Sequence, residues 1–594
     1  MNMKKTSLLC MLALTLASSI RLKAQEVPIL EKTHDVSRKA RNGYLGGIEM
    51  NKEKETIDMI YVLPSLLPRK VKTEIYTYDK DLNLINTVKE EEFLEKVKTR
   101  WKWFNYRGDI YVTTTLTAST DLGGKLVFRK KLITYNYNWY YGSYMKKVKQ
   151  LEKVKPTTDT DAKYVYKCSY EVAADSTVLV IAGIPEKKTQ NAWKKFEIMS
   201  CDNQVNIKTI GKIDFEFPVQ PFFSAPLQDD NTSVTNDDSP RDWIIIFAPM
   251  GSFKEKDPNP NNYTYIRLSP KGELKERFNF TSPSTAWRVQ GAYEKEGSVF
   301  LYGSAINKEG KYAESAMNNS LMVPTTSASM EEKKLGQAQP AGPMGGFGGM
   351  SSMDFGQTQE ELDLTLDELK YTNFQIGKVS NGKFDFISSP SIEEFEKKQA
   401  KPVDQKKFVV FDGKKFVVNG ISFTSSGDIF ISGQDFVKKD NDRIFKGIYM
   451  FQFEPNGTLK KNYGVFVDQK KKKGFFNDAN LTSDMVIASN YIYESADKQS
   501  LYWLLKSAKN VECTGTKNAN QNTQVCKPLF GFDYGAIKIT NGELSEFKTF
   551  GEDEKRTFYL FENTGGYVMN NYLFFFSESL KGGQILLTRM DLTK

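Results

Sequence analysis

Short apolar runs recur along the chain, each following a turn that contains Gly or Asp. Clear examples are GSVFLYG at 297–303, GDIFISG at 427–433 and DSTVLVI at 175–181. β-Branched and aromatic residues dominate these runs, which favours short buried strands over helices. The runs begin near Ile57, Asp109, Thr177, Trp243, Ser298, Asp428, Ser500 and Tyr572. Their starts are mostly about 50 to 75 residues apart, with one gap of about 130, and this regularity predicts a repeated structural unit.

A hairpin with a tight polar turn follows most of these runs. The turns lie at 79–81, 202–204, 270–272, 381–382, 455–457 and 541–542. Two of them are Asn-Gly pairs, a strong hairpin signal because both residues tolerate a positive φ angle. A further strand precedes each run, as in KFVVNGISF at 415–423. Each repeated unit is therefore predicted to contain four antiparallel strands.

This pattern resembles the blades of β-propeller proteins, and the resemblance covers nearly the whole mature chain. We predict an all-β, eight-bladed β-propeller, with seven blades as the alternative because the second unit (98–155) has an irregular hairpin. The last unit lacks an outer fourth strand, and the segment from Val27 to Thr33 would supply it and close the ring. The WD and kelch signatures are absent, so the resemblance implies no particular functional residues.

Three regions are expected along the chain. Residues 1–24 combine Lys4 and Lys5 with a short apolar stretch, which is typical of a secretory signal peptide. Residues 25–594 would form the single propeller domain. A Gly/Met/Pro-rich insertion at 316–362 would interrupt the fifth blade as a disordered loop, because its composition buries too little apolar surface to fold alone.

Because the chain is expected to be exported, its cysteines are candidates for disulfide bonds. Four of the five cysteines follow the signal peptide, and an even number in an exported chain favours disulfides. We predict a Cys513–Cys526 disulfide that clips a polar loop and a Cys168–Cys201 disulfide within one unit, with buried free thiols as the alternative for each pair. The expected location is the periplasm, or the outer membrane surface or exterior, of a Gram-negative bacterium. No later stretch is apolar for 18 residues, so no transmembrane segment is expected in the mature chain.

Composition and motifs exclude several classes of function. The formal net charge is +9, and loss of the four basic residues of the signal peptide would leave about +5. Lysines are spread along the chain, so a nucleic acid partner is not expected. His34 is the only histidine in the sequence, so His-based catalytic triads and ordinary zinc sites are not expected. There is no CxxC pair, no GxSxG and no phosphate-binding glycine loop, so the sequence favours a protein without catalytic residues or cofactors.

Candidate contact residues are aromatic or lie in the insertion. Exposed aromatic side chains can stack on sugars or anchor a protein partner, with packing between blades as the alternative. Residues of the insertion would order on a partner. The candidates are Trp101, Trp103, Trp139, Tyr140, Tyr141, Met344, Phe347 and Met350.

An acidic loop before the fourth unit's apolar run offers oxygen ligands for a structural Ca²⁺. Its spacing does not match an EF-hand, and a solvated loop is the alternative. The candidate ligands are Asp229, Asp230, Asp237 and Asp238.

These observations predict an exported, non-enzymatic propeller that acts as a protein-binding or scaffold module in the bacterial cell envelope. One alternative is a carbohydrate-binding or carbohydrate-cleaving propeller, which needs only carboxylates placed by the fold. A second alternative is an accessory component of an envelope secretion or assembly machine.

Overall fold

The structure is a computed structural model, and it describes the strands and most of their turns. The described residues are 29–63, 70–93, 110–120, 126–138, 143–154, 164–172, 177–185, 193–229, 240–249, 262–284, 286–307, 370–400, 409–439, 442–466, 491–515, 524–539, 541–545, 547–550, 558–560, 567–579 and 582–593. The predicted signal peptide (1–24) and the insertion (316–362) lie outside this part of the chain. Along the chain, the insertion falls between β18 (Ser298–Ile306) and β19 (Asn373–Ser380).

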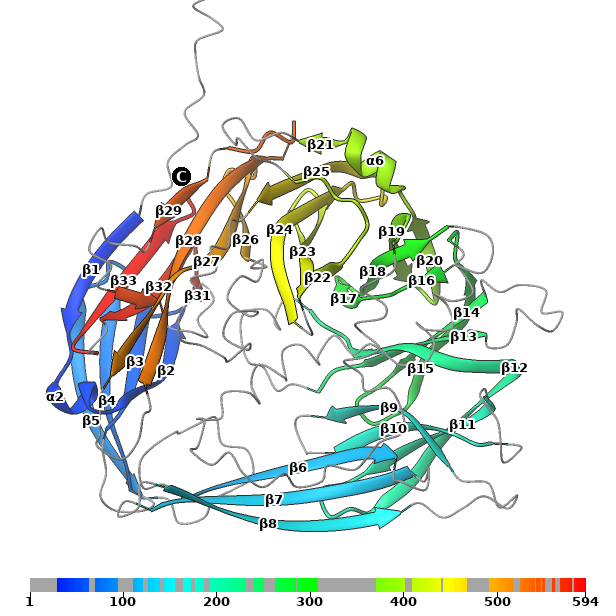
Figure 1. Cartoon of the computed structure of the whole chain (residues 1–594), viewed down its shortest axis with the longest axis horizontal. Coiled ribbons are helices and arrows are strands. Elements are labelled where there is room, and N and C mark those ends of the chain that lie inside the picture. The colour runs from blue at the N-terminus through cyan, green and yellow to red at the C-terminus, as the bar shows by residue number, and fades with distance from the viewer. Residues whose placement is uncertain are drawn as a thin grey trace, which may run out of the picture.

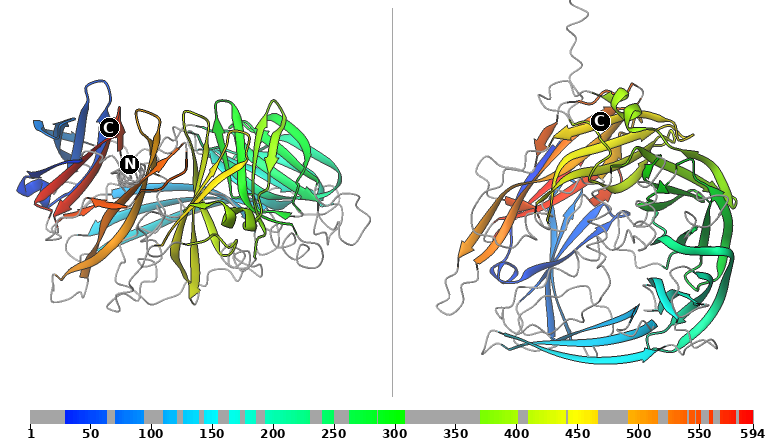
Figure 2. Two further views of the ribbon diagram at one scale, coloured as in Figure 1. Left: turned by 90° about the horizontal axis from the view of Figure 1, so that it is seen from above. Right: turned by 45° about the vertical axis from the view of Figure 1, so that its right-hand side comes forward.

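The described chain is all-β, and its strands form several antiparallel sheets that follow one another around the molecule in chain order (Figure 1). The first sheet contains β2 (Tyr44–Asn51), β3 (Thr56–Val62), β4 (Lys70–Asp79) and β5 (Leu84–Phe93). The next contains β6 (Ile110–Thr120), β7 (Leu126–Asn138) and β8 (Ser143–Val154). Figure 2 shows that the sheets are arranged as successive layers around the molecule and do not stack as a two-layer sandwich.

The third sheet is the largest, with seven strands in the order β15-β14-β13-β12-β11-β10-β9. Its strands are β9 (Val165–Val172), β10 (Thr177–Gly183), β11 (Trp193–Cys201), β12 (Ile207–Pro226), β13 (Trp243–Pro249), β14 (Asn262–Leu268) and β15 (Leu274–Thr281).

The remaining sheets complete the succession. One contains β16 (Ala286–Trp287), β17 (Gly291–Lys295), β18, β19 and β20 (Lys383–Ser388). Another contains β22 (Phe416–Phe423), β23 (Ile429–Lys439), β24 (Asp442–Phe453) and β25 (Leu459–Phe466), with β21 (Gln399–Ala400) added in parallel to β25. A further one contains β26 (Tyr491–Glu494), β27 (Ser500–Gly515), β28 (Gln524–Lys538) and β29 (Lys548–Phe550). Two short helices, α2 (Arg38–Arg41) and α6 (Ile392–Lys397), are N-capped by Ser37 and Ser391. No helix of the described ranges is both long and apolar enough to cross a bilayer.

The last sheet joins the two ends of the chain. It contains β30 (Phe558–Leu560), β31 (Tyr567–Met569), β32 (Tyr572–Ser579) and β33 (Gln584–Asp591), and β1 (Ile29–Asp35) pairs with β33 along its whole length. The register runs from Ile29 opposite Met590 to Asp35 opposite Gln584. The predicted addition of an N-terminal strand to the last unit is therefore confirmed.

β12 belongs to two groups of strands at once. Its first part, from Ile207 to Asp214, pairs with β11, and its last part pairs with β13 from Val219 onward; Val219 also pairs with Trp193 of β11. Pro218 and Pro221 lie at the crossing, where register shifts interrupt both ladders, as expected for residues that lack a backbone donor. The first part is largely exposed and the last part is buried, so β12 is an outer strand for one group and an inner strand for the next.

The apolar core is divided into clusters that lie between neighbouring groups of strands. One cluster joins β18 and β19 to β22–β25 through stacked and edge-on rings, including Phe374, Phe395, Phe416 and Phe451. Another joins β2–β4 to β31–β33. Sheets that share such a cluster therefore bury their facing surfaces against each other, as in other repeat architectures.

Gly433 provides the space that one of these aromatic clusters needs. A Cβ added to Gly433 would lie 2.0 Å from the Phe416 ring, and Phe416 itself is 3% exposed. We therefore expect Gly433→Ala to lower the free energy of unfolding by about 1–3 kcal/mol through overpacking. Chemical denaturation measures this change. Gly47→Ala is the matched control, because an added Cβ there meets nothing within 4 Å; equal losses in both variants would contradict the packing argument.

The predicted disulfide between Cys168 and Cys201 is wrong. Both thiols are free and buried. Cys168 packs with Leu179 and Ile181 on one face of the sheet, whereas Cys201 packs with Val178 and Val180 on the other. Alternate residues of β10 point to opposite faces, so the two sulfurs are separated by the sheet itself.

The backbone register bears on the other predicted disulfide. Cys513 and Cys526 lie directly opposite each other in the ladder between β27 and β28. Their side chains lie outside the part that the structure describes, so this disulfide remains a prediction.

Candidate functional site

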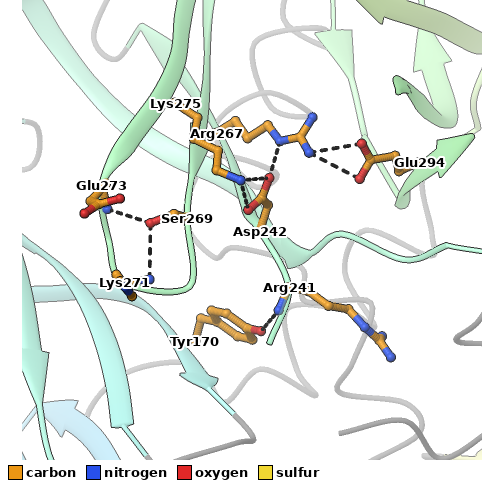
Figure 3. A network of polar contacts seen from close by, with 9 residues as sticks. All are labelled: Tyr170, Arg241, Asp242, Arg267, Ser269, Lys271, Glu273, Lys275 and Glu294. Atoms are coloured by element: carbon orange, nitrogen blue, oxygen red, sulfur yellow. Dashed lines mark hydrogen bonds and ion pairs between the residues drawn. The ribbon is translucent and has the colours of Figure 1, made fainter. Parts of the chain in front are cut away.

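A network of charged side chains joins the start of β13 to the neighbouring sheet (Figure 3). Asp242, which is 8% exposed, accepts a hydrogen bond from Arg267 Nε at 2.6 Å. Lys275 Nζ donates to both oxygens of the same carboxylate, at 2.7 and 2.9 Å. Arg267 Nη2 reaches the carboxylate of Glu294 on β17 at 3.1 and 3.2 Å. One guanidinium thus bridges two carboxylates from different sheets.

The turn between β14 and β15 brings Lys275 alongside Asp242. Ser269 Oγ accepts from the backbone N–H groups of Lys271 and Glu273 at 3.2 and 3.1 Å, as Figure 3 shows. Gly272 has a φ of +81°, a conformation that favours glycine in such a turn. The tight turn pairs Leu268 with Leu274, and Lys275 therefore emerges beside the end of β14.

A second contact holds the start of β13 against the inner end of the same large sheet. The backbone N–H of Arg241 donates to Tyr170 Oη of β9 at 3.1 Å (Figure 3). The Tyr170 ring lies 6.1 Å from that of Trp243. Asp242 is therefore fixed on both sides, by Tyr170 through its neighbour and by Arg267 directly.

Burial changes the electrostatics around this network. Burial alone would lower the pKa of Arg267, but its hydrogen bonds to Asp242 and Glu294 outweigh that effect and raise it. Burial raises the pKa of Tyr265, and the charge of Glu276 raises it further. Tyr265 therefore keeps its proton at neutral pH. Among the described residues, neither Tyr265 Oη nor Glu276 Oε2 has a hydrogen-bond partner, although both are buried.

Part of this arrangement recurs in the sheet of β22–β25. Asp428 lies just before β23 as Asp242 lies before β13, and Lys460 Nζ reaches it at 2.8 Å. The position of Arg267 is occupied there by Gln452, which donates to Asp428 at 2.7 Å and accepts from Tyr463 Oη at 2.6 Å. The Asp–Lys bridge is therefore found in both sheets. The Asp242 network differs in having a cation, Arg267, between the two carboxylates of Asp242 and Glu294.

The position of Glu294 also recurs with a different partner. Glu294 lies opposite Val299 in its ladder, as Glu494 lies opposite Leu501. Glu494 accepts from the backbone N–H and the hydroxyl of Ser425, at 2.9 and 3.0 Å, in the turn of the preceding sheet. A carboxylate at this position thus contacts the preceding sheet in both places. Of these two carboxylates, only Glu294 shares a cation with a second carboxylate, because Arg267 bonds both Glu294 and Asp242.

The network is open to solvent on one side. Glu294 is 31% exposed and Lys275 is 47% exposed, whereas Asp242 and Arg267 are mostly covered. Glycosidases hold two carboxyl groups roughly 5 to 9.5 Å apart across the bond that they cleave. The Arg267 guanidinium holds the carboxylates of Asp242 and Glu294 near each other, the first through Nε and the second through Nη2. The arrangement can therefore supply paired carboxylates to a ligand that approaches from the side of Glu294.

Most residues that the sequence singled out lie outside the described part of the chain. These are Trp101, Trp103, Trp139, Tyr140, Tyr141, Met344, Phe347, Met350, Asp230, Asp237 and Asp238. Asp229 is described and partly exposed, and the described residues contain no group of three or more His, Cys, Asp or Glu side chains that could hold a metal ion. The sequence alone did not predict Asp242, Arg267, Lys275 or Glu294, since the predicted acidic cluster ends at Asp238. The available signal was the acidic residue that precedes an apolar run at both Asp242 and Asp428.

The comparisons with known proteins concern the fold. No family model matches the sequence, and no curated protein matches it. Among solved structures, the polysaccharide lyase Uly1 is similar over 97% of this chain and 94% of its own, with 8% identity and a TM-score of 0.29. A mutant of the Synechocystis apocarotenoid oxygenase is similar over 78% of this chain and 81% of its own, with 10% identity and a TM-score of 0.26.

These comparisons correct one prediction. The polysaccharide lyase and the apocarotenoid oxygenase are both enzymes, which contradicts the prediction of a non-enzymatic protein-binding or scaffold module. At TM-scores this low, the likeness transfers neither a substrate nor a reaction to this chain. A function for this protein therefore has to be inferred from the side chains of the Asp242 network.

Proposed function

We propose that the protein is a carbohydrate-cleaving enzyme that hydrolyses a glycosidic bond with the carboxylate pair Asp242 and Glu294. The observation that carries the proposal is the Arg267 guanidinium, which bonds Asp242 at 2.6 Å and Glu294 at 3.1 Å. Glycoside hydrolysis needs two carboxyl groups of different roles and no metal or organic cofactor. Glu294 is the more exposed of the two and would exchange a proton with the leaving oxygen.

The other side chains would position this pair. Arg267 and Lys275 hold Asp242 through charge-assisted hydrogen bonds, which are stronger and shorter than neutral ones. Tyr265 is fully buried and keeps its proton, so it is unsuited to abstract a proton as the base of a lyase. Hydrolysis is therefore the favoured reaction among carbohydrate cleavages.

Activity of Glu294→Gln tests this proposal. We expect the variant to lose at least about 100-fold in the rate of reducing-end release from whichever polysaccharide of a panel the wild type cleaves, because general acid–base groups contribute about 10²–10⁴-fold. Asp242→Asn should show a comparable loss. Thermal melts of both variants check that they remain folded.

Asp428→Asn is the matched control. It breaks an equally buried Asp–Lys bridge in another sheet, where no second carboxylate is shared, and should keep wild-type activity per folded molecule. Full activity of Glu294→Gln would contradict the proposal. So would an equal loss in Asp428→Asn, or the absence of cleavage of every polysaccharide by the wild type.

We also infer that the sheets form an eight-bladed propeller. The support is the double role of β12, which lets the seven-stranded sheet count as two blades of four strands that share one strand. The sheet of β6–β8 would be the irregular second blade, and β1 would complete the last one. Export through the signal peptide at 1–24 likewise remains a proposal, supported by the sequence pattern there.

A further inference from the structure

A β-bulge sets Lys167 apart from the other residues of β9. Ile181 of β10 lies opposite Cys168 and the next residue, Ala182, lies opposite Tyr166, so Lys167 is the extra residue of the ladder. A bulge re-aims the side chain that it carries, and bulges are over-represented beside functional sites. β9 is also the edge strand of its sheet and lies on the inner side in Figure 1.

The re-aimed lysine lies on the face of an indole. Lys167 Nζ is 3.0 Å from the ring centroid of Trp193, at the start of β11. Gly183 leaves room for this ring, since a Cβ there would lie 3.0 Å from the indole. Trp193 is 6% exposed, and its Nε1–H has no hydrogen-bond partner among the described residues. An amine and an unused N–H donor therefore meet at one place.

Apart from the face of the Trp193 indole, which attracts a cation, the surroundings of Lys167 contain little that would hold a positive charge. None of the described carboxylates forms an ion pair with its amine. β10, the strand that pairs with β9, has no titratable residue, and neither has the part of β12 from Val219 to Pro226. β6, which also packs near β9, carries Tyr111 as its only titratable side chain.

The nearby titratable groups lie on β9 and β11. On β9 they are Tyr166, Tyr170, Glu171 and the thiol of Cys168. Burial raises the pKa of that thiol to about 12, so it is neutral at pH 7. On β11 they are Lys194, Lys195, Glu197 and Cys201. The carboxylate of Glu197 is already bonded to Tyr164 and Thr209.

Burial of the Lys167 amine lowers its pKa to about 7, and the neighbouring Cys168 opposes this only weakly. At pH 7 roughly half of the Lys167 amines would be neutral, against about 1 in 2,500 for a lysine of ordinary pKa. The neutral amine is the nucleophilic form, and desolvated lysines are the ones that form Schiff bases.

We propose that Lys167 and Trp193 form a carbonyl-reactive site that binds a small aldehyde as a reversible imine. This site is independent of the Asp242 network and of the glycosidase proposal. Lys167 Nζ attacks the carbonyl carbon, a C–N bond forms, and the carbonyl oxygen takes up a proton to give a carbinolamine. Loss of that hydroxyl with the remaining amine proton releases one water and leaves the imine. No oxidant or reductant is consumed, and the indole N–H would donate to the oxygen during the attack.

Reductive labelling of the full-length protein tests the site. The protein is treated with propionaldehyde and cyanoborohydride, which traps the imine, and labelled lysines are identified by peptide mass mapping. At pH 7 we expect Lys167 to be labelled at least about tenfold faster than the exposed Lys195 on β11. Labelling of Lys167 should rise with pH through a midpoint near 7 and then level off, whereas labelling of Lys195 should continue to rise.

Two variants separate reactivity from simple packing. Lys167→Arg keeps the cation over the ring and should remove this label without changing the melting temperature by more than a few degrees. Trp193→Phe keeps a ring but lacks the N–H, and we expect labelling at least about threefold slower. Equal labelling rates for Lys167 and Lys195 in the wild type would overturn the proposal, as would the absence of a midpoint between pH 6 and 8. Unchanged labelling in Trp193→Phe would overturn the role of the indole N–H.

Discussion

Removing β1 by deleting all residues before Val36 is expected to lower the free energy of unfolding by at least about 4 kcal/mol. β1 pairs with β33 at seven consecutive positions, and each net backbone hydrogen bond contributes about 0.5–1.5 kcal/mol. Its side chains also bond to the first sheet, with His34 Nε2 2.8 Å from the carbonyl oxygen of Leu82. The deletion would therefore remove part of the contact between the first sheet and the last and expose the edge of β33.

Urea denaturation measures the loss, and gel filtration detects association through the exposed edge, which is the usual fate of an unprotected strand. Lys32→Ala is the control, because it removes only an exposed side-chain bond to Asn83 and should change stability by less than about 0.5 kcal/mol. A deletion variant as stable as Lys32→Ala would show that the pairing of β1 with β33 contributes little to the fold.

Phe374→Ala is expected to cost about 3–5 kcal/mol of the free energy of unfolding, the range for truncating a buried aromatic residue. Phe374 is fully buried, and its ring centroid lies 5.2 Å from that of Phe451 and 6.2 Å from that of Phe416. The residue belongs to β19, whereas Phe416 and Phe451 belong to the next sheet. The substitution therefore opens a cavity between two sheets and weakens the contact that holds them together.

Guanidinium denaturation gives the magnitude, and the slope of the transition reports whether unfolding remains cooperative. Leu274→Ala serves as the comparison, since Leu274 is 51% exposed and its truncation should change stability by less than about 0.5 kcal/mol. Similar costs at both positions would mean that the cluster around Phe374 is loosely packed.

The strands could be predicted because each buried strand carries its own local signal. The runs expected near Thr177, Trp243, Ser298 and Tyr572 begin at those residues in the structure. The turns also carry a local sequence signal. Gly272, Gly382, Gly457 and Gly542 all have the positive φ that their hairpins need.

Features that depend on position across a sheet or between sheets could not be predicted. The predicted disulfide between Cys168 and Cys201 was wrong because spacing in the sequence does not show on which face of the sheet each sulfur lies. Asp242 and Glu294 are far apart in the chain and meet only because β17 packs beside the end of β12, where Gln228 bridges Tyr293. The bulge at Lys167 has no sequence signal, since it depends on the register that β10 imposes.

The strand β12 has a consequence for how the molecule opens. A strand that is the outer member of one group and the inner member of the next cannot leave one group without disturbing the other. Local unfolding in proteins proceeds in contiguous cooperative blocks. The strands from β9 to β15 therefore form one such block of seven strands, whereas the neighbouring sheets have three and five. Tyr170 and Asp242, which meet near the start of β13, stay in register for as long as this block is intact.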